Sequence, residues 1–480
     1  MIRDAINNLI KWKDGDHRKP LIIHGARQVG KTWIMKEFGK THYEKTAYIN
    51  FDNNERMENL FGGNIDIPRI ITALQIESGV TIEANNTLII FDEVQEVPRA
   101  LTSLKYFNEN APQYHIIAAG SLLGVELHPG TSFPVGKVDF MDLYPLSFTE
   151  FLNATGNKDL TSLLETKDFN LVKSFKGRYI DLLKQYYFVG GMPEAVSIFI
   201  ETQDYNIVRE VQNRLLVAYE QDFSKHAPNE VVPRIRMLWA SIPAQLAKKN
   251  RKFMYGLIRQ GARAKEYELA MQWLLDCGLI YKVGRITKPV MPLMAYQDPN
   301  AFKLFVLDVG LLSAMSGLDI KSLLEGNRVF EEFKGALTEQ YVLQQLKSNK
   351  GIEPFYWSAE RSNGEIDFVF QSGMNIIPLE VKASENLQAK SLKSYYSKYE
   401  PKYAIRTSMS DYRKEEWLIN LPLYAINGIL GVLGIEDFEK KEQILNVRSK
   451  IEMAEQSRLA GNSTVSLTEA RKRLEDKYNG

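Results

Sequence analysis

The 480-residue sequence contains one cysteine, has a net charge of only +1 and lacks long apolar runs. A single cysteine excludes a disulfide framework within the chain and favours a reducing, cytoplasmic location. Cys277 itself lies in an apolar run and is expected to pack in a core. No stretch reaches the roughly 18 apolar residues of a membrane span, and residues 1–14 carry scattered charges without a signal-peptide core. The charge balance argues against a uniformly basic nucleic-acid binder, although a local basic patch remains open.

A glycine-rich stretch with the pattern G-x-x-x-x-G-K-T begins at Gly25. It follows the apolar run Leu21–His24, which suits a buried strand, and precedes Trp33–Phe38, which suits a helix. In this context the backbone N–H groups point at an anion, so the pattern predicts a P-loop that binds ATP. Lys31 is expected on the β- and γ-phosphates and Thr32 on Mg²⁺. The predicted nucleotide-binding residues are Gly25, Ala26, Arg27, Gln28, Val29, Gly30, Lys31 and Thr32.

A second apolar run, from Thr87 to Phe91, ends in two acids, Asp92 and Glu93. This is the Walker B pattern, in which a buried strand carries an acid that emerges beside the P-loop. Asp92 is therefore predicted to hold Mg²⁺, and Glu93 is predicted to polarise the attacking water as a general base.

Three further segments are suited to strands: Thr46–Phe51, Tyr114–Ser121 and Lys137–Leu143. Their alternation with helical segments predicts a mostly parallel α/β sheet with helices on both faces. Ser121 is a candidate sensor of the γ-phosphate or the water, and a helix-capping serine is the alternative.

Together, GARQVGKT, LIIFDEVQ, AAGS, the stretch Phe133–Phe151, Gly190–Ala195 and Phe302–Leu312 resemble one group of bacterial and archaeal AAA-type ATPases. The resemblance spans roughly residues 1–430 and implies a C-terminal domain of uncharacterised function. ATPases of this class often complete their sites between subunits, so a homo-oligomer is an open expectation. We expect an ATPase core over 1–150 and a helical lid over 151–228.

Two features stand out between the core and the C-terminal region. Gly190-Gly191-Met192-Pro193 predicts a sharp turn within the helical lid. Arg178, Arg209 and Arg214 are candidate arginine fingers, with a solvated helix face as the alternative for each.

Residues 229–325 suggest a winged helix, with helices over Lys252–Gln260 and Ala264–Asp276 and strands over Leu279–Arg285 and Phe302–Leu307. The second helix would then enter the major groove of DNA. The basic residues Arg259, Arg263 and Lys265 would contact the DNA phosphates. The same helix also carries two acids, Glu266 and Glu268, which suit a module that docks another protein. DNA binding and protein docking therefore both stay open.

Residues 326–435 carry a second group of chemically suggestive residues. Two predicted strands flank a turn at residues 371–375, which places Asp367 nearly opposite Glu380. Facing carboxylates destabilise a sheet unless a divalent cation lies between them. Lys382 shares a face with Glu380 and is predicted to stabilise developing charge or orient water.

The spacing of Asp367, Glu380 and Lys382 resembles the PD-(D/E)xK nuclease site, and Glu339 on a predicted helix matches the additional upstream acid of that superfamily. The resemblance implies a second divalent metal at Glu339, Asp367 and Glu380, although Glu365-Ile366 stands where proline often precedes the first acid. Ordinary surface charges and an inactive binding module are the alternatives. The stretch Lys390–Lys402 alternates lysine and tyrosine and suits either nucleic acid or a solvated helix. Residues 436–480 form a charged tail without assigned chemistry.

The sequence therefore predicts a Mg²⁺-dependent ATPase core, a lid, a winged helix and a restriction-endonuclease-like α/β domain, with DNA as the expected polymer. A nucleotide-dependent switch that docks proteins and cuts nothing is the first alternative. A P-loop kinase acting on a small molecule is the second, disfavoured by the Asp92-Glu93 pair.

Overall fold

The computed structural model describes residues 1–120, 134, 136–248, 251–321, 330–349, 351–359, 364–385 and 390–435. The chain divides into two compact units, Met1–Asn427 and Gly428–Gly480. The described part of the second unit contains the short helix α18 (Ile429–Val432). The predicted tail, 436–480, lies outside the described residues. None of the helices in the described ranges is long and apolar enough to cross a membrane.

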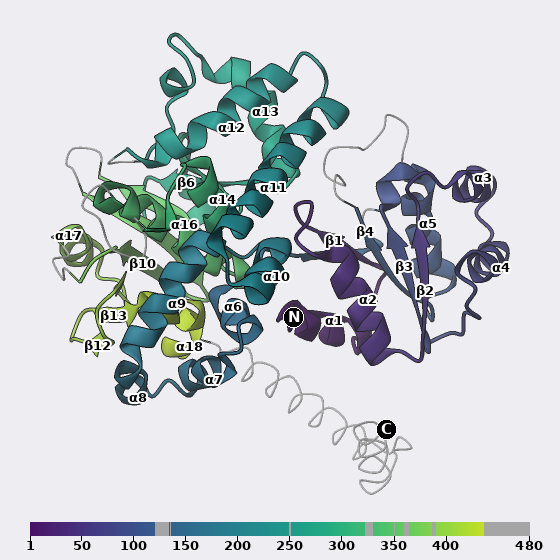
Figure 1. Cartoon of the computed structure of the whole chain (residues 1–480), viewed down its shortest axis with the longest axis horizontal. Coiled ribbons are helices and arrows are strands. Elements are labelled where there is room, and N and C mark those ends of the chain that lie inside the picture. The colour runs from purple at the N-terminus through teal and green to yellow at the C-terminus, as the bar shows by residue number, and fades with distance from the viewer. Residues whose placement is uncertain are drawn as a thin grey trace, which may run out of the picture. The chain divides into compact units, whose positions relative to one another are not determined.

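The N-terminal region forms a five-stranded parallel sheet in the order β2-β3-β4-β1-β5 (Figure 1). Its strands are β1 (Leu21–His24), β2 (Lys45–Asn50), β3 (Thr87–Asp92), β4 (His115–Ala119) and β5 (Asp139–Asp142). Its helices are α1 (Ala5–Lys13), α2 (Lys31–His42), α3 (Glu55–Gly62), α4 (Ile67–Ser78) and α5 (Pro98–Asn110), with a 3₁₀ turn η1 (Val94–Glu96). The predicted parallel α/β core is confirmed, and β4 separates the P-loop strand from the Walker B strand.

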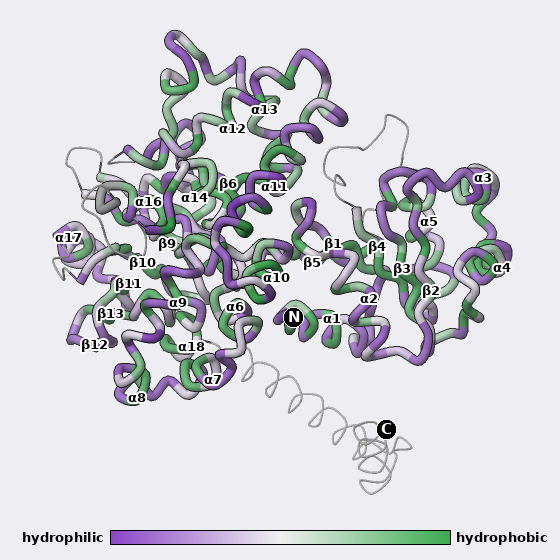
Figure 2. The backbone as a smooth tube through the Cα atoms, viewed as in Figure 1, coloured by the Kyte–Doolittle hydropathy of each residue, from purple (hydrophilic) through white to green (hydrophobic). Residues whose placement is uncertain are grey.

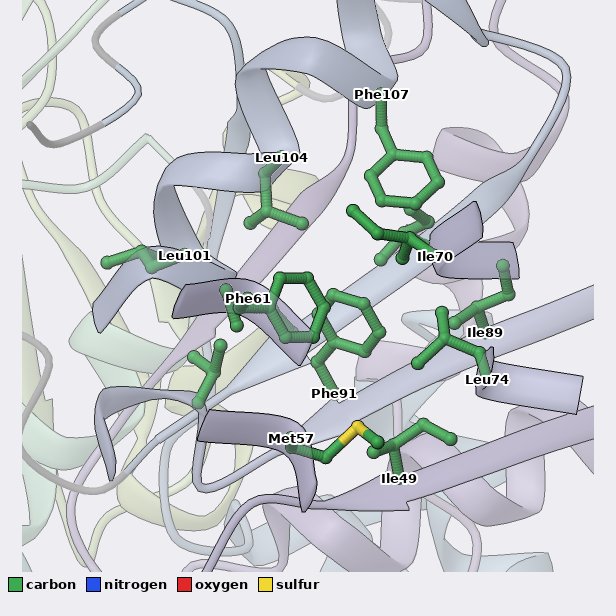
Figure 3. Packing of buried hydrophobic residues seen from close by; sticks show 14 of the residues in the cluster. Ile49, Met57, Phe61, Ile70, Leu74, Ile89, Phe91, Leu101, Leu104 and Phe107 are labelled. Atoms are coloured by element: carbon green, nitrogen blue, oxygen red, sulfur yellow. The ribbon is translucent and has the colours of Figure 1, made fainter. Parts of the chain in front are cut away.

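Buried apolar side chains fix the sheet between its helices. Strands β1, β3 and β4 are hydrophobic along most of their length (Figure 2), because both of their faces are covered. Alternate residues Ile89 and Phe91 join Phe61 and Leu104 in a cluster under α3, α4 and α5 (Figure 3). Side chains of intervening residues point to the other face, where α2 contacts the sheet. The strand ends that carry the predicted site are therefore held rigidly.

A series of helices follows the core. Its helices are α6 (Phe148–Ala154), α7 (Lys158–Thr166), α8 (Phe169–Ser174), α9 (Lys176–Val189), α10 (Pro193–Thr202), α11 (Tyr205–His226), α12 (Val232–Leu246), α13 (Ala264–Asp276) and α14 (Val309–Met315). The helix predicted over Lys252–Gln260 is wrong, since only the 3₁₀ turn η2 (Tyr255–Leu257) forms there. Gly256 lowers the helix propensity, and the Phe253 N–H donates instead to the Phe302 carbonyl at 2.9 Å.

An eight-stranded mixed sheet, ordered β12-β13-β11-β10-β9-β8-β6-β7, contains the remaining strands. They are β6 (Ile280–Ile286), β7 (Gln297–Val306), β8 (Phe355–Ser358), β9 (Glu365–Ser372), β10 (Asn375–Val381), β11 (Ile405–Ser408), β12 (Arg413–Lys414) and β13 (Ile419–Pro422). The accompanying elements are η3 (Leu293–Tyr296), α16 (Phe330–Ser348), α17 (Lys390–Tyr399) and η4 (Leu423–Gly428). Of the elements predicted for a winged helix, α13 and the hairpin β6–β7 are present, but β6 also pairs with β8. The hairpin is thus built into this sheet and does not stand apart as a wing.

The turn predicted at Gly190–Pro193 lies against the buried side chain of Asp308. This carboxylate caps α14 by accepting from the Leu311 N–H at 3.0 Å, and it accepts from the Gly191 N–H at 2.6 Å. A Cβ atom at Gly190 would overlap Asp308, and one at Gly191 would overlap the Leu146 carbonyl. Glycine is required at both positions because the chains approach so closely.

Helix α16 connects this turn to the start of α14, to β7 and to the start of α6 through buried glutamines. Gln344 donates to Asp308 at 3.0 Å and accepts from the Val309 N–H at 2.9 Å. Gln340 bonds both backbone groups of Val306, and Gln345 accepts from the Phe148 N–H at 2.8 Å. Polar side chains inside the protein are stable here because each completes backbone hydrogen bonds.

We expect Asp308→Ala to lower the free energy of unfolding by about 3–5 kcal/mol, because two buried N–H groups lose their acceptor at about 1–3 kcal/mol each. Asp66→Ala is the matched control, since Asp66 caps α4 through the Arg69 N–H at 3.1 Å but is exposed. That change should cost only about 1 kcal/mol. Urea denaturation of both variants measures the difference, and equal costs would contradict a buried role for Asp308.

Candidate nucleotide site

The P-loop connects β1 to α2 with the conformation expected of an anion-binding turn. Gly30, at the start of α2, has φ +96°, a left-handed conformation that favours glycine. At Gly25 a Cβ atom would overlap the Leu143 carbonyl. Because α2 begins directly at Lys31, its first N–H groups are directed toward the loop.

Lys31 is buried inside the loop. Its Nζ donates to the carbonyl oxygens of Gly25 and Ala26 at 2.8 and 2.9 Å. Burial lowers the pKa of Lys31 to about 8, while the charges of Glu93 and Asp92 oppose this shift. The ammonium is thus held at the loop by the same backbone that would surround a phosphate chain.

Asp92, at the end of β3, lies within hydrogen-bond distance of Thr32. Its Oδ2 accepts from the Thr32 hydroxyl at 2.8 Å and from the Tyr48 hydroxyl at 2.9 Å. Burial, followed by the charge of Asp92, raises the pKa of Tyr48, so this hydroxyl stays protonated and donates. The structure therefore brings together the two predicted Mg²⁺ ligands of the site, a hydroxyl and a carboxylate.

Glu93 follows in a left-handed conformation with φ +52°, and its Oε2 accepts from the Gln95 amide at 2.8 Å. It borders a cavity of about 90 Å³ that is also bordered by Arg27, Tyr219 and Trp273. A larger cavity of about 390 Å³ reaches Gly25 and Ala26. Glu93 thus lies on the same small cavity as the tip of the loop.

Residues from distant parts of the chain contact the P-loop backbone. The Tyr219 hydroxyl of α11 donates to the Arg27 carbonyl at 3.0 Å, and Asp222 forms an ion pair with the Arg27 guanidinium. Gly278, with φ +68°, packs so closely that a Cβ atom would lie 3.3 Å from the Ala26 nitrogen. Arg3 donates to the Val29 carbonyl at 3.2 Å. No sequence motif marked these contacts, which arise only from the tertiary fold.

The remaining predicted residues of the ATPase region lie elsewhere. Ser121 is outside the described residues. Arg209 donates to the Ser313 hydroxyl at 3.0 Å and the Leu318 carbonyl at 2.9 Å, which holds it within the helical region. Arg178 donates to Asn157 at 2.7 Å, and Arg214 lies 3.9 Å from Glu194. The structure thus places the three candidate fingers in contacts within the helical region.

The C-terminal acids lie on neighbouring elements, as predicted. Leu379 pairs with Phe368 in the β9–β10 hairpin, and the Val381 N–H donates to Asp367 Oδ2 at 2.7 Å. Lys382 Nζ lies 2.8 Å from Glu380 Oε1. Glu380 Oε2 is buried and has no hydrogen-bond partner among the described residues.

Two cations missed by the sequence analysis contact Glu339 on α16. Arg251 forms an ion pair with it, and Lys303 Nζ lies 3.7 Å away while also pairing with Glu365 at 2.5 Å. Burial and the nearby Glu339 charge raise the pKa of Asp367, whereas Arg251 and Lys303 outweigh burial and lower that of Glu339. Across the described residues, no group of three acidic, histidine or cysteine side chains is placed to hold a metal. The side chains present therefore do not fit the predicted second metal site in this conformation.

Helix α17 turns its lysines toward solvent, whereas base stacking would require exposed tyrosine rings. Tyr395 is buried, meets Trp357 edge-on and packs at a tilt against Tyr399, and Tyr396 packs against Trp417. These rings complete the core under the sheet, whereas Lys390, Lys393 and Lys398 are exposed. The interpretation of Lys390–Lys402 as a stacking surface is not supported for these tyrosines, because their rings already have partners.

The P-loop on β1, the intervening strand β4 and the acid at the end of β3 define a P-loop nucleotide-binding domain. Residues 17–152 match the family described as AAA domain. The N-terminal region is therefore a P-loop ATPase domain of the AAA type. Residues 180–322 and 334–425 match two domains of unknown function, DUF8612 and DUF4143, which assign no activity. No curated protein matches the chain.

Solved structures with a similar chain course include the Walker-type ATPase PABY2304 of Pyrococcus abyssi. It is 13% identical, with a TM-score of 0.41 over 65% of this chain and 95% of that one. The ORC1 protein of Aeropyrum pernix in complex with DNA is 11% identical, with a TM-score of 0.25 over 66% of this chain and 93% of that one. Cdc6p from Pyrobaculum aerophilum is 11% identical, with a TM-score of 0.22 over 67% of this chain and 92% of that one.

The contact of Gly278 with the P-loop predicts a selective effect on nucleotide binding. Gly278→Ala should displace the Ala26 N–H and weaken affinity for a fluorescent ATP analogue by about 1 kcal/mol, roughly fivefold. Gly261→Ala is the control, because Gly261 has φ +78° but nothing near its Cβ position. Both changes carry a left-handed strain of about 1–2 kcal/mol, and only the first should affect binding. Equal affinities in the two variants would contradict this role.

Proposed function

We propose that this protein binds and hydrolyses ATP with Mg²⁺ at the P-loop. The observation that carries the proposal is the hydrogen bond between Thr32 and Asp92 beside the buried ammonium of Lys31. The oxygens of Thr32 and Asp92 suit Mg²⁺, which prefers hard oxygen ligands. Mg²⁺ held there would neutralise charge on the β- and γ-phosphates.

Each residue of the site has a separate role in this proposal. Backbone N–H groups from Gly25 to Thr32 bind the phosphates, and Lys31 exchanges its loop carbonyls for phosphate oxygens. Glu93 accepts a proton from the attacking water, because general-base catalysis requires a carboxylate near that water. Ser121 remains the proposed sensor of the γ-phosphate. A cytoplasmic location and assembly into a homo-oligomer are part of the same proposal.

Two substitutions separate binding from chemistry. Lys31→Ala should abolish ATP hydrolysis and weaken ATP binding, because the phosphate charge loses its cation. Glu93→Gln should retain binding and lower kcat by about 10²–10⁴-fold, the usual contribution of a general base. Calorimetry and a phosphate-release assay measure the two effects. Lys40→Ala, exposed on the same helix, is the control and should behave as wild type. Unchanged turnover in Lys31→Ala would refute the site.

We further propose that the C-terminal region is a nuclease-like, DNA-associated domain coupled to the ATPase. The hairpin of β9 and β10 carries Asp367 and Glu380, α16 carries Glu339, and β10 pairs in parallel with β11. Glu380 Oε2, buried without a partner, supports a site that accepts a further ligand.

The alternative, a nucleotide-dependent switch that docks proteins and has no nuclease activity, is supported by the cations on Glu339. Protein docking would then involve the helices α12 and α13. Because these cations already neutralise Glu339, the acid needs no metal to be stable inside the protein. This favours a structural role for the acid cluster.

Nicking of supercoiled plasmid distinguishes these two functions. With Mg²⁺ and ATP present, the nuclease-like proposal expects nicking by the wild type and its loss, by at least about 10²-fold, in Asp367→Asn. ATP hydrolysis should persist in that variant, because the P-loop is unaffected. Glu353→Gln, an exposed acid paired with Lys347, is the control. Intact plasmid under every condition would favour the docking switch.

A further inference from the structure

The P-loop contains an arginine, Arg27, whose side chain is held by an acid from a helix outside the ATPase core. We propose that Arg27 is a catalytic cation that contacts the γ-phosphate of ATP, and that Asp222 on α11 retains its guanidinium until a triphosphate binds. This inference rests on the proposed ATP hydrolysis. It adds a residue that stabilises the transition state and a helix that detects the nucleotide.

Helix α11 contacts both the backbone and the side chain of Arg27. Tyr219 and Asp222 are three residues apart on this helix, so their side chains leave the same face. The Tyr219 hydroxyl donates to the Arg27 carbonyl at 3.0 Å, and Asp222 forms an ion pair with the guanidinium. The first contact fixes the loop backbone at this residue. The guanidinium can therefore change its partner while the loop stays in place.

A cavity of about 90 Å³ is bordered by Arg27 and by the proposed general base, Glu93. This volume has room for several water molecules. Trp273 borders the same cavity, and its buried indole N–H has no hydrogen-bond partner among the described residues. A polar occupant of the cavity would supply that acceptor. Because the attacking water lies between Glu93 and the γ-phosphate, the phosphate and the guanidinium of Arg27 would border the same space.

A second cation at this place would act on the chemical step. The water oxygen bonds to the γ-phosphorus and gives a proton to Glu93, while the bond to the β–γ bridging oxygen breaks and ADP leaves with the electron pair. Negative charge is spread over the γ-phosphate oxygens during this step. Lys31 supplies one positive charge. The guanidinium of Arg27 supplies another, with two parallel N–H groups that fit phosphate oxygens.

The ion pair with Asp222 can be exchanged for a phosphate. The Arg27 side chain is 49% exposed, whereas that of Asp222 is only 14% exposed. Burial raises the pKa of Asp222, and the charge of Arg27 offsets this effect only in part. Lys225 and His226, one turn further along α11, also act to lower this pKa, so the carboxylate keeps cations nearby when Arg27 leaves. A phosphate with about two negative charges competes well against one carboxylate.

This exchange lets α11 distinguish ATP from ADP. With ADP the γ-phosphate is missing, so Asp222 keeps the guanidinium. With ATP the ion pair is lost, whereas the contact of Tyr219 with the loop backbone remains. Because α11 packs against α12 and α14, a shift of α11 would be transmitted to helices beyond the ATPase core.

Phosphate release and calorimetry with the full-length protein test the role of Arg27. Arg27→Ala should lower kcat by about 10³-fold, the lower end of the contribution of an arginine finger. Its affinity for ADP should stay unchanged, because ADP does not reach the guanidinium. Arg27→Lys should recover only part of kcat, since an ammonium lacks the paired donors of a guanidinium.

Calorimetry with ADP and with a non-hydrolysable ATP analogue tests the role of Asp222. Asp222→Asn should raise affinity for the analogue by about three- to tenfold and leave that for ADP unchanged, because the guanidinium no longer has to leave a counter-ion. In an Arg27→Ala background the same change should have no effect. Glu220→Gln is the matched control, since it removes one charge from an exposed position on the opposite side of α11. This variant should behave as wild type.

The outcomes that overturn this proposal differ from those that overturn ATP hydrolysis. If Arg27→Ala turns over ATP like wild type while Lys31→Ala does not, the P-loop hydrolyses ATP and Arg27 is not catalytic. If Asp222→Asn changes the affinities for ADP and for the analogue equally, α11 supports the loop without detecting the γ-phosphate. If the wild type binds neither nucleotide, the proposed function fails as well. A selective gain in affinity cannot arise from misfolding, so Asp222→Asn decides the question even where Arg27→Ala does not fold.

Discussion

The constraint on which the structure depends is the satisfaction of buried backbone groups by a few polar side chains. Asp308 accepts the N–H groups of Gly191 and Leu311, and Gln344 joins it from α16. Loss of one of these acceptors would leave a buried N–H group without a partner, at a cost of about 1–3 kcal/mol. That cost is a large part of the roughly 5–15 kcal/mol free energy of unfolding of a typical domain. These hydrogen bonds hold α14 and α16 against the turn that precedes α10.

The ATP site is therefore not isolated within its domain. Tyr219 and Gly278, both from the region beyond the core, touch the backbone of Arg27 and Ala26. A change in the P-loop on phosphate binding would be felt directly by α11 and by the turn before β6. The chain thus provides a physical connection between nucleotide occupancy and the helices that precede the C-terminal acids.

Elements that depend on local sequence patterns could be predicted correctly. The glycines of the P-loop, the buried strand ending at Asp92 and the helix Ala264–Asp276 all follow from spacing and hydrophobicity. Contacts between residues far apart in the sequence could not be predicted. Arg251 and Lys303 contact Glu339 from other elements, and Tyr48 donates to Asp92 from another strand. The helix expected at Lys252–Gln260 was wrong because Phe253 pairs with Phe302, a partner far along the chain.

The shared eight-stranded sheet has a consequence for how the protein can be divided. Strand β6 pairs with β7 on one side and with β8 on the other, so its two neighbours come from different halves of the C-terminal portion. A fragment that stops before β8 would present an open ladder of unpaired amides and carbonyls, the usual template for aggregation. The regions on the two sides of β8 therefore have to stay in one fragment if the eight-stranded sheet is to form.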